Sequence, residues 1–245
     1  MNKFFRSLTM AVTLLIVWQL IIWIFHLPDY FLPSPAQVFL ELIHQAPVIF
    51  TQAKTTILET LLGLFFGVLF GGCAAIVVTI FKPLRLWVIP ILVLSQAIPT
   101  FAIAPVLVLW LGYGIASKVA TATIMIFFPI VTTLYDGLQQ TSQIWLDIAK
   151  TMNASRWKIL RYIQLPAAMP SFSSGLRVAA AIAPIGAVVG EWVGSSSGLG
   201  YLMLNANARL DIPMMFAALF VLTMFTLILY FIVDRLLQRL IWWRQ

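Results

Sequence analysis

Charged residues are scarce in this sequence: they make up 9% of its 245 residues, whereas ordinary soluble domains carry about a quarter. Hydrophobic residues make up 62%, and the mean hydropathy is +0.99. This balance excludes an ordinary soluble domain and indicates an integral membrane protein. The apolar runs are long enough for membrane-spanning helices, and they lack the short alternating pattern of a β-barrel.

Residues suited to metal binding and catalysis are also few. The single cysteine, Cys73, lies inside an apolar run, and His26 and His44 are far apart, which excludes disulfides and gives no metal-ligand spacing. The P-loop pattern G-x-x-x-x-G-K-[ST] does not occur, so the chain does not supply ATP hydrolysis. The serines at 195–197 have no histidine or acid at a spacing that suggests nucleophilic catalysis. We therefore expect no metal, no cofactor and no enzymatic activity.

Six apolar runs predict six membrane-spanning helices, at about residues 8–25, 57–80, 87–111, 118–135, 178–193 and 214–233. The first run resembles a signal peptide, but it is too long and no cleavage pattern of small residues follows it. We expect an uncleaved first span. The fold class is then all-α, with residues 1–245 forming a single transmembrane domain and residues 137–177 a polar loop.

Basic residues are distributed unevenly between the two sides of these spans. With both termini inside, the cytoplasmic side carries twelve of them: Lys3, Arg6, Lys82, Arg85, Lys150, Arg156, Lys158, Arg161, Arg177, Arg235, Arg239 and Arg244. The outer side carries three: Lys54, Lys118 and Arg209. Because Lys and Arg are enriched in cytoplasmic loops, both termini are predicted to be cytoplasmic. The same rule accounts for the net charge of +7 without a nucleic-acid partner.

Three residues are candidates for a translocation pathway: Pro99, Glu59 and Glu191. A proline kink frees backbone carbonyls, which membrane proteins tolerate only against protein or a water-filled cavity; a purely structural kink is the competing explanation for Pro99. Acids within spans are functional candidates by default. Both glutamates fall near predicted outer ends of spans, so a location at the membrane interface is their competing explanation.

Glycines mark two further places in the chain. The second span contains Gly63, Gly67, Gly71 and Gly72. The four-residue spacing of the first three lets helix backbones approach closely, and packing is favoured over a role in a pore. The glycine- and serine-rich stretch 190–201 is predicted to be a re-entrant or mouth loop.

The main polar interruption of the second half is the segment Asp147–Pro166, DIAKTMNASRWKILRYIQLP. Its apolar residues recur at helical spacing on both sides of Asn153, a residue type that often ends helices in the left-handed conformation. We expect two short cytoplasmic helices hinged at Asn153, with Pro166 and Pro170 preventing simple continuation. The cations Arg156, Lys158 and Arg161 can pair with acids of a partner or with phospholipid; cytoplasmic charge bias alone is the competing explanation.

This segment resembles the EAA loop of permease subunits from binding-protein-dependent ABC importers. In that family the pattern is Glu-Ala-Ala, three residues, Gly, nine residues and Ile-x-Leu-Pro. The spacing is intact here, with these residues at the motif positions: Asp147, Ile148, Ala149, Asn153, Ile163, Leu165 and Pro166. Asp for Glu keeps the acid, and Asn for Gly keeps access to positive φ. Ile148 is bulkier than the alanine of the pattern.

The resemblance implies a six-helix permease of the bacterial inner membrane with both termini cytoplasmic. Its implied partners are cytoplasmic ABC ATPase subunits, a periplasmic substrate-binding protein, a second permease copy in a homodimer, and membrane lipid. The residues implied to couple to the ATPase are Asp147, Ala149, Asn153, Ala154, Ser155, Arg156, Trp157, Leu160, Leu165 and Pro166. Within this set, Trp157 and Leu160 are expected to offer apolar knobs to the partner.

Other stretches are similar to the nitrate, sulfonate and taurine branch of the family: PSPAQVF, AIPTFAIAPVLVLWLGYG and GEWVGSSSGLGYLM. The last loop and span look most like permeases for a pyrimidine precursor of thiamine. The implied substrate is such a pyrimidine, or a sulfonate-, taurine- or nitrate-like anion. Two other classes remain open: an ion-coupled secondary transporter, and a membrane assembly subunit that transports nothing.

Overall fold

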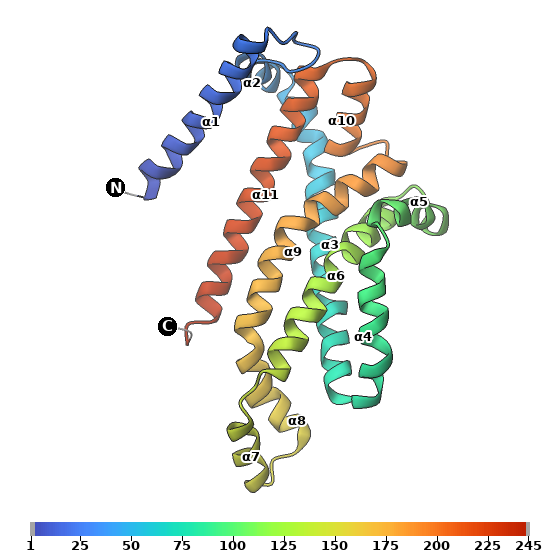
Figure 1. The fold of residues 1–245 in the computed structure, drawn as a ribbon. Coiled ribbons are helices and arrows are strands. Elements are labelled where there is room, and N and C mark those ends of the chain that lie inside the picture. The colour runs from blue at the N-terminus through green and yellow to red at the C-terminus, as the bar shows by residue number, and fades with distance from the viewer. Residues whose placement is uncertain (1–2, 244–245) are drawn as a thin grey trace. The chain divides into compact units, whose positions relative to one another are not determined.

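The computed structural model describes residues 3–243, all of whose regular elements are helices. Figure 1 shows them in chain order. They are α1 (Lys3–Phe25), α2 (Pro35–His44), α3 (Ala46–Ile80), α4 (Lys82–Ala97), α5 (Thr100–Leu111), α6 (Ile115–Gln139), α7 (Gln143–Thr151), α8 (Arg156–Ile159), the π-helix η1 (Leu160–Gln164), α9 (Leu165–Gly194), α10 (Leu199–Ala208) and α11 (Ile212–Leu240). Arg244 of the charge count lies outside the described residues, as do the side chains of Lys3, Arg6 and Lys82.

The helices form two compact units. The first comprises Met1–Thr55 and Ser196–Met224, and the second comprises Thr56–Ser195 and Phe225–Gln245. In the first unit the side chain of Ser34 accepts a hydrogen bond from the Gln37 amide and caps α2, with Pro35 in the first turn. The Gly198 amide there donates a 2.7 Å hydrogen bond to the side chain of Gln52.

Four helical runs are long and apolar enough to cross a membrane: Ala46–Ile80, Ile115–Gln139, Arg156–Gly194 and Ile212–Leu240. The third predicted span is not one helix, because α4 ends at Ala97 and α5 begins at Thr100, with Pro99 as the cap between them. A proline restricts the residue before it to extended conformations, and Ile98 is extended. Six spans and cytoplasmic termini remain predictions.

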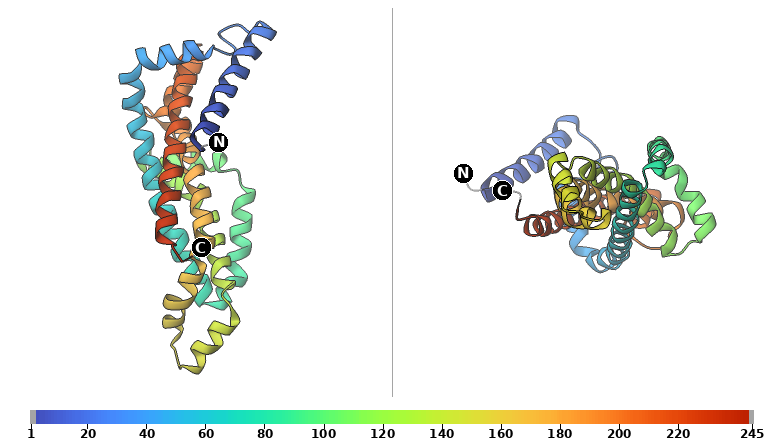
Figure 2. Two further views of the ribbon diagram at one scale, coloured as in Figure 1. Left: turned by 90° about the vertical axis from the view of Figure 1, so that its left-hand side faces the viewer. Right: turned by 90° about the horizontal axis from the view of Figure 1, so that it is seen from below.

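The second unit is built on close packing of α6 with α9, and α3 lies against α6 through its glycines (Figures 1 and 2). The glycines of α3 face α6: a β-carbon added to Gly63 would lie 2.5 Å from Cβ of Ala122, and one added to Gly71 would lie 2.8 Å from Ile130. The packing explanation of this glycine spacing is confirmed. Helix α9 also approaches the α6 backbone closely: β-carbons added to Gly186 and Gly190 would lie 2.7 Å from Cα of Ala122 and 2.9 Å from Cα of Lys118.

Two expectations about α9 are wrong. Pro166 and Pro170 do not end the helical path, which is continuous from Arg156 to Gly194. The π-helix η1 comes directly before Pro166, and such a local π adjustment accommodates a proline within a continuous membrane helix. Interior prolines such as Pro170 are tolerated in membrane helices for the same reason. The stretch 190–201 is not mainly a loop either, since α9 reaches Gly194 and α10 begins at Leu199. Gly190 serves close helix packing, because a β-carbon there would lie 2.9 Å from the Lys118 backbone. Gly198 instead has a φ of +107° just before α10.

Candidate functional site

The segment Asp147–Pro166 contains two short helices joined by a tight turn, as the sequence predicted. In Figures 1 and 2 it extends beyond the ends of α6 and α9, which it connects. Helix α7 ends at Thr151, Asn153 has a φ of +53°, and α8 starts at Arg156. Ser155 caps α8 by accepting a hydrogen bond from the Lys158 amide.

The turn at Asn153 satisfies the backbone at the end of α7. The Asn153 amide donates to the Lys150 carbonyl, and the Ala154 amide donates to the Ala149 carbonyl, each over 2.9 Å. This is the Schellman arrangement, which requires a left-handed residue at the position that Asn153 occupies. The angle between α7 and α8 is therefore fixed by backbone hydrogen bonds rather than by side-chain contacts alone.

The side chains of the segment divide into exposed and anchored groups. Trp157 is 59% exposed, and its neighbours Ser155 and Arg156 are exposed as well. Leu160 is only 2% exposed and packs in a core cluster with Leu138 of α6. The expectation that Leu160 offers an apolar knob to a partner is wrong, because the helical path after Asn153 turns this side chain toward α6.

A groove of about 990 Å³ lies between α7 and the run from α8 into α9. Its apolar lining includes Trp145, Ile148, Met152, Tyr162 and Trp243. Asp147 is not among its lining residues; its carboxylate accepts hydrogen bonds from Lys150 over 2.8 Å and Gln143 over 3.1 Å. These bonds lower the pKa of the Asp147 carboxyl below its ordinary value, with the Lys150 bond contributing most.

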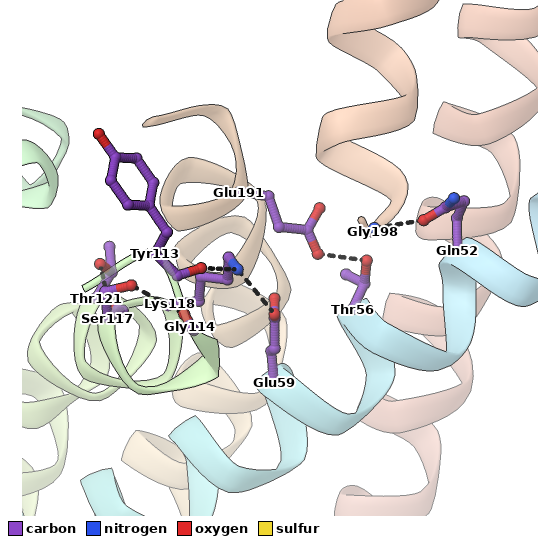
Figure 3. A network of polar contacts seen from close by, with 10 residues as sticks. All are labelled: Gln52, Thr56, Glu59, Tyr113, Gly114, Ser117, Lys118, Thr121, Glu191 and Gly198. Carbon is purple, nitrogen blue, oxygen red and sulfur yellow. Dashed lines mark hydrogen bonds and ion pairs between the residues drawn. The ribbon is translucent and has the colours of Figure 1, made fainter. Parts of the chain in front are cut away.

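A second set of polar residues is buried within the second unit, as Figure 3 shows. The hydroxyl of Thr56 on α3 donates a 2.6 Å hydrogen bond to the carboxylate of Glu191 on α9. Lys118 of α6 lies with its Nζ 3.9 Å from Oε1 of Glu59 on α3, and it donates to the Tyr113 carbonyl over 3.2 Å. All four side chains are buried: Thr56 and Glu59 are 0% exposed, Glu191 1% and Lys118 4%.

A family model described as "Binding-protein-dependent transport system inner membrane component" matches residues 63–242. The chain belongs to this family. It is 49% identical over 240 residues, 98% of each chain, to a probable ABC transporter permease protein of Haemophilus influenzae. It is 34% identical over 233 residues to the formylaminopyrimidine transport permease protein ThiX of Halalkalibacterium halodurans, covering 95% of this chain and 93% of ThiX.

The fold agrees with this membership. The inward-facing MetNI methionine ABC transporter matches with a TM-score of 0.70 at 18% identity, over 80% of this chain and 97% of that chain. The protein is therefore the membrane-embedded permease subunit of an ABC importer. Importers of this class work with an ATPase and a substrate-binding protein, so these are the partners that membership implies.

In this permease the predicted site residues separate into three places. The predicted coupling residues lie together in the Asp147–Pro166 segment, within residues 63–242, which the family model matches. Glu59 and Glu191 come together in the buried cluster, and both are enclosed by protein. Pro99 is exposed at the start of α5 and is not part of that cluster.

Sequence reasoning missed Lys118 as a member of the cluster. It was placed at the outer end of the fourth predicted span, but α6 begins three residues earlier, at Ile115, and Lys118 is buried. A lysine inside the start of an apolar span was the available signal, because such a residue needs a nearby acid.

Proposed function

We propose that this permease imports a small solute across the bacterial inner membrane, powered by a separate ATPase that engages the Asp147–Pro166 segment. The proposal rests on the first turn of α8, which is exposed and directly follows the turn at Asn153. The chain also belongs to the family of importer permeases. Small residues at Ala154 and Ser155 allow a partner to approach closely. Trp157 offers it an apolar contact.

The anchoring of the segment supports a mechanical role. Leu160 is packed against α6, and the helical path from Arg156 runs without interruption to Gly194. A force applied to α8 therefore acts on a helix that also carries Glu191 at its far end. Closure of two ATPase subunits around nucleotide would move two such helices, one in each copy of a permease homodimer, between inward- and outward-facing states.

Co-purification with the ATPase tests the docking step. Trp157→Ala is expected to reduce recovery of the ATPase at least tenfold, and Asp147→Lys to reduce it further. The matched control is Trp192→Ala, since Trp192 is also a half-exposed tryptophan of the same unit, at 53% against 59% for Trp157. Normal ATPase recovery with both segment variants would contradict the docking proposal.

The energy source is tested by uptake into proteoliposomes that contain the permease and the ATPase, with the binding protein added outside. We expect uptake only with ATP inside the vesicles. Uptake that continues without ATP and follows an ion gradient would make the chain a secondary transporter. A permease deletion with no substrate-dependent phenotype would favour the assembly role instead.

For the substrate we propose a pyrimidine related to thiamine precursors. The similarity to ThiX over nearly the whole length of both chains supports this class. Competition in the same vesicles provides the test: an excess of unlabelled aminopyrimidine should abolish uptake of a labelled one, while taurine and nitrate should leave it unchanged. Inhibition by taurine or nitrate alone would assign the permease to the anion branch.

We also propose six spans and cytoplasmic termini. The basic residues of the segment and of the α11 end support this orientation, because cytoplasmic loops collect such residues. A reporter active only in the cytoplasm, fused after Gln245, should be active. The same reporter inserted in the turn between α1 and α2 should be silent.

A further inference from the structure

The turn between α5 and α6 is weakly determined by its own residues. It consists of Gly112, Tyr113 and Gly114, and Gly112 has a φ of +81°. Among residues 3–243, a β-carbon added to either glycine would have only its chain neighbours within 4 Å. Glycine also loses more conformational freedom on ordering than any other residue. A fixed turn here therefore depends on contacts from other parts of the fold.

Lys118 of α6 provides such a contact. Its ammonium group donates a 3.2 Å hydrogen bond to the Tyr113 carbonyl, in the middle of the turn. The same group lies 3.9 Å from Oε1 of Glu59 on α3, and both side chains are buried. Figure 3 shows the lysine nitrogen between these two partners. Because a buried charge needs an opposite charge nearby, Glu59 holds the ammonium group where it reaches the turn.

Helix α9 leaves space for this arrangement. A β-carbon added to Gly190 would lie 2.9 Å from Cα of Lys118 and 3.2 Å from its Cβ and Cγ, so a larger residue would displace the lysine. One turn further along α9, a β-carbon at Gly194 would lie 3.0 Å both from the Tyr113 ring and from Val108 of α5. The two glycines bring α9 against Lys118 and against the end of α5.

The other end of α5 is the interruption at Ile98 and Pro99, where the backbone is extended. Helix α5 is therefore a separate rigid piece, which tilts as a unit unless one of its ends is held. We propose that Lys118 is a positioning residue. By binding the Tyr113 carbonyl while paired with Glu59, it fixes the α5–α6 turn, so that α5 moves together with α3, α6 and α9.

Spin labels test the fixation in the full-length permease. With the single cysteine removed by Cys73→Ser, labels are attached at Tyr113→Cys on the turn and at Leu109→Cys on α5, two side chains that are 77% and 81% exposed. The bond from Lys118 survives the label on the turn, because it uses the backbone carbonyl. Both labels should be equally restricted. In Lys118→Met/Glu59→Leu the label on the turn should lose this restriction.

The double variant is chosen to keep the protein folded. It replaces the ion pair by apolar residues, which proteins tolerate better than a buried charge without its partner. Lys118→Arg keeps a cation with several N–H donors and should keep the turn restricted. Thr121→Ala is the control, because it removes a buried hydroxyl of the same helix that binds the Ser117 carbonyl rather than the turn. A freely moving turn in the wild type, or a restricted one in the double variant, would overturn the proposal.

A consequence for transport rests on the proposed function and has a separate readout. In proteoliposomes with ATP inside, and with the binding protein and an aminopyrimidine outside, the stimulation of ATP hydrolysis should fall about fivefold in the double variant. Recovery of the ATPase should stay normal, since the Asp147–Pro166 segment is unchanged. Equal stimulation in the double variant and the wild type would show that fixing α5 is not needed for coupling. A wild type without stimulation would contradict the proposed function, while the spin labels would still decide whether Lys118 fixes the turn.

Discussion

The Nε of Arg177 on α9 lies 2.6 Å from Oδ1 of Asp234 on α11, in a pair that is about one quarter exposed. The guanidinium also donates to Ser173 on its own helix, and Gln238 donates to the second oxygen of Asp234. Both carboxylate oxygens are therefore occupied. The pair joins two helices of the second unit that are far apart in sequence, close to an apolar cluster around Val233 and Leu237.

Removing this pair should destabilise the second unit. Arg177→Met is expected to lower the free energy of unfolding, because it removes the charge-assisted hydrogen bond to Asp234 and leaves Oδ1 of that carboxylate without it. The midpoint of thermal unfolding in detergent measures the loss. A double-mutant cycle with Asp234→Asn isolates the interaction. Strict additivity of the two single effects would show that the pair contributes nothing.

The glycine face of α3 allows a comparison between two positions in one helix. A β-carbon at Gly63 would meet Cβ of Ala122, which cannot rotate away, whereas one at Gly72 has its nearest neighbour 4.0 Å away in Leu134. We expect Gly63→Ala to cost about 1 to 3 kcal/mol through overpacking. Gly72→Ala should be neutral or stabilising by up to about 1 kcal/mol, as alanine is the better helix former. Thermal unfolding of both variants in the same detergent checks this contrast, and equal effects would contradict it.

The left-handed backbone at Asn153 predicts opposite effects for two substitutions. Asn153→Gly should be tolerated, because glycine adopts a φ of +53° without a steric penalty. Asn153→Val should disrupt the turn, because a β-branched residue is strongly disfavoured there. The measurement is stimulation of ATPase activity by the reconstituted permease: the glycine variant should stay within about twofold of the wild type, and the valine variant should lose most stimulation. Wild-type stimulation by the valine variant would argue against a fixed angle between α7 and α8.

Local signals in the sequence were sufficient for the turn at Asn153 and for the packing role of Gly63, since both depend on nearby spacing. They failed at Pro170 and Leu160, where the outcome depends on the continuous path of η1 and α9 beside α6. The pairing of Lys118 with Glu59 could not be predicted, because it depends on how α3 and α6 align. One amino-acid sequence carries no direct record of that alignment.

The carboxyl group of Asp147 provides a prediction about pH at the Asp147–Pro166 segment. Hydrogen bonds from Lys150 and Gln143 lower its pKa in the folded state. A carboxyl whose folded pKa is depressed stabilises the fold above its unfolded pKa, and this contribution is lost as the pH falls through the folded pKa. The carboxylate should therefore stay ionised, and α7 intact, to a more acidic pH than an isolated aspartate would allow.

Removing the main donor should shift this titration. In Lys150→Met the pKa of Asp147 should rise toward its ordinary value, because the first of its two hydrogen bonds is gone. The pH titration of the carboxyl carbon by NMR, in permease labelled at aspartate, measures the change. The matched control is Lys158→Met, which removes an exposed cation of the same segment that makes no bond to Asp147. Added salt should raise the wild-type pKa slightly, because the pair with Lys150 is exposed to solvent. If the pKa of Asp147 were the same in the wild type and in Lys150→Met, the hydrogen bond from Lys150 would not be what lowers it.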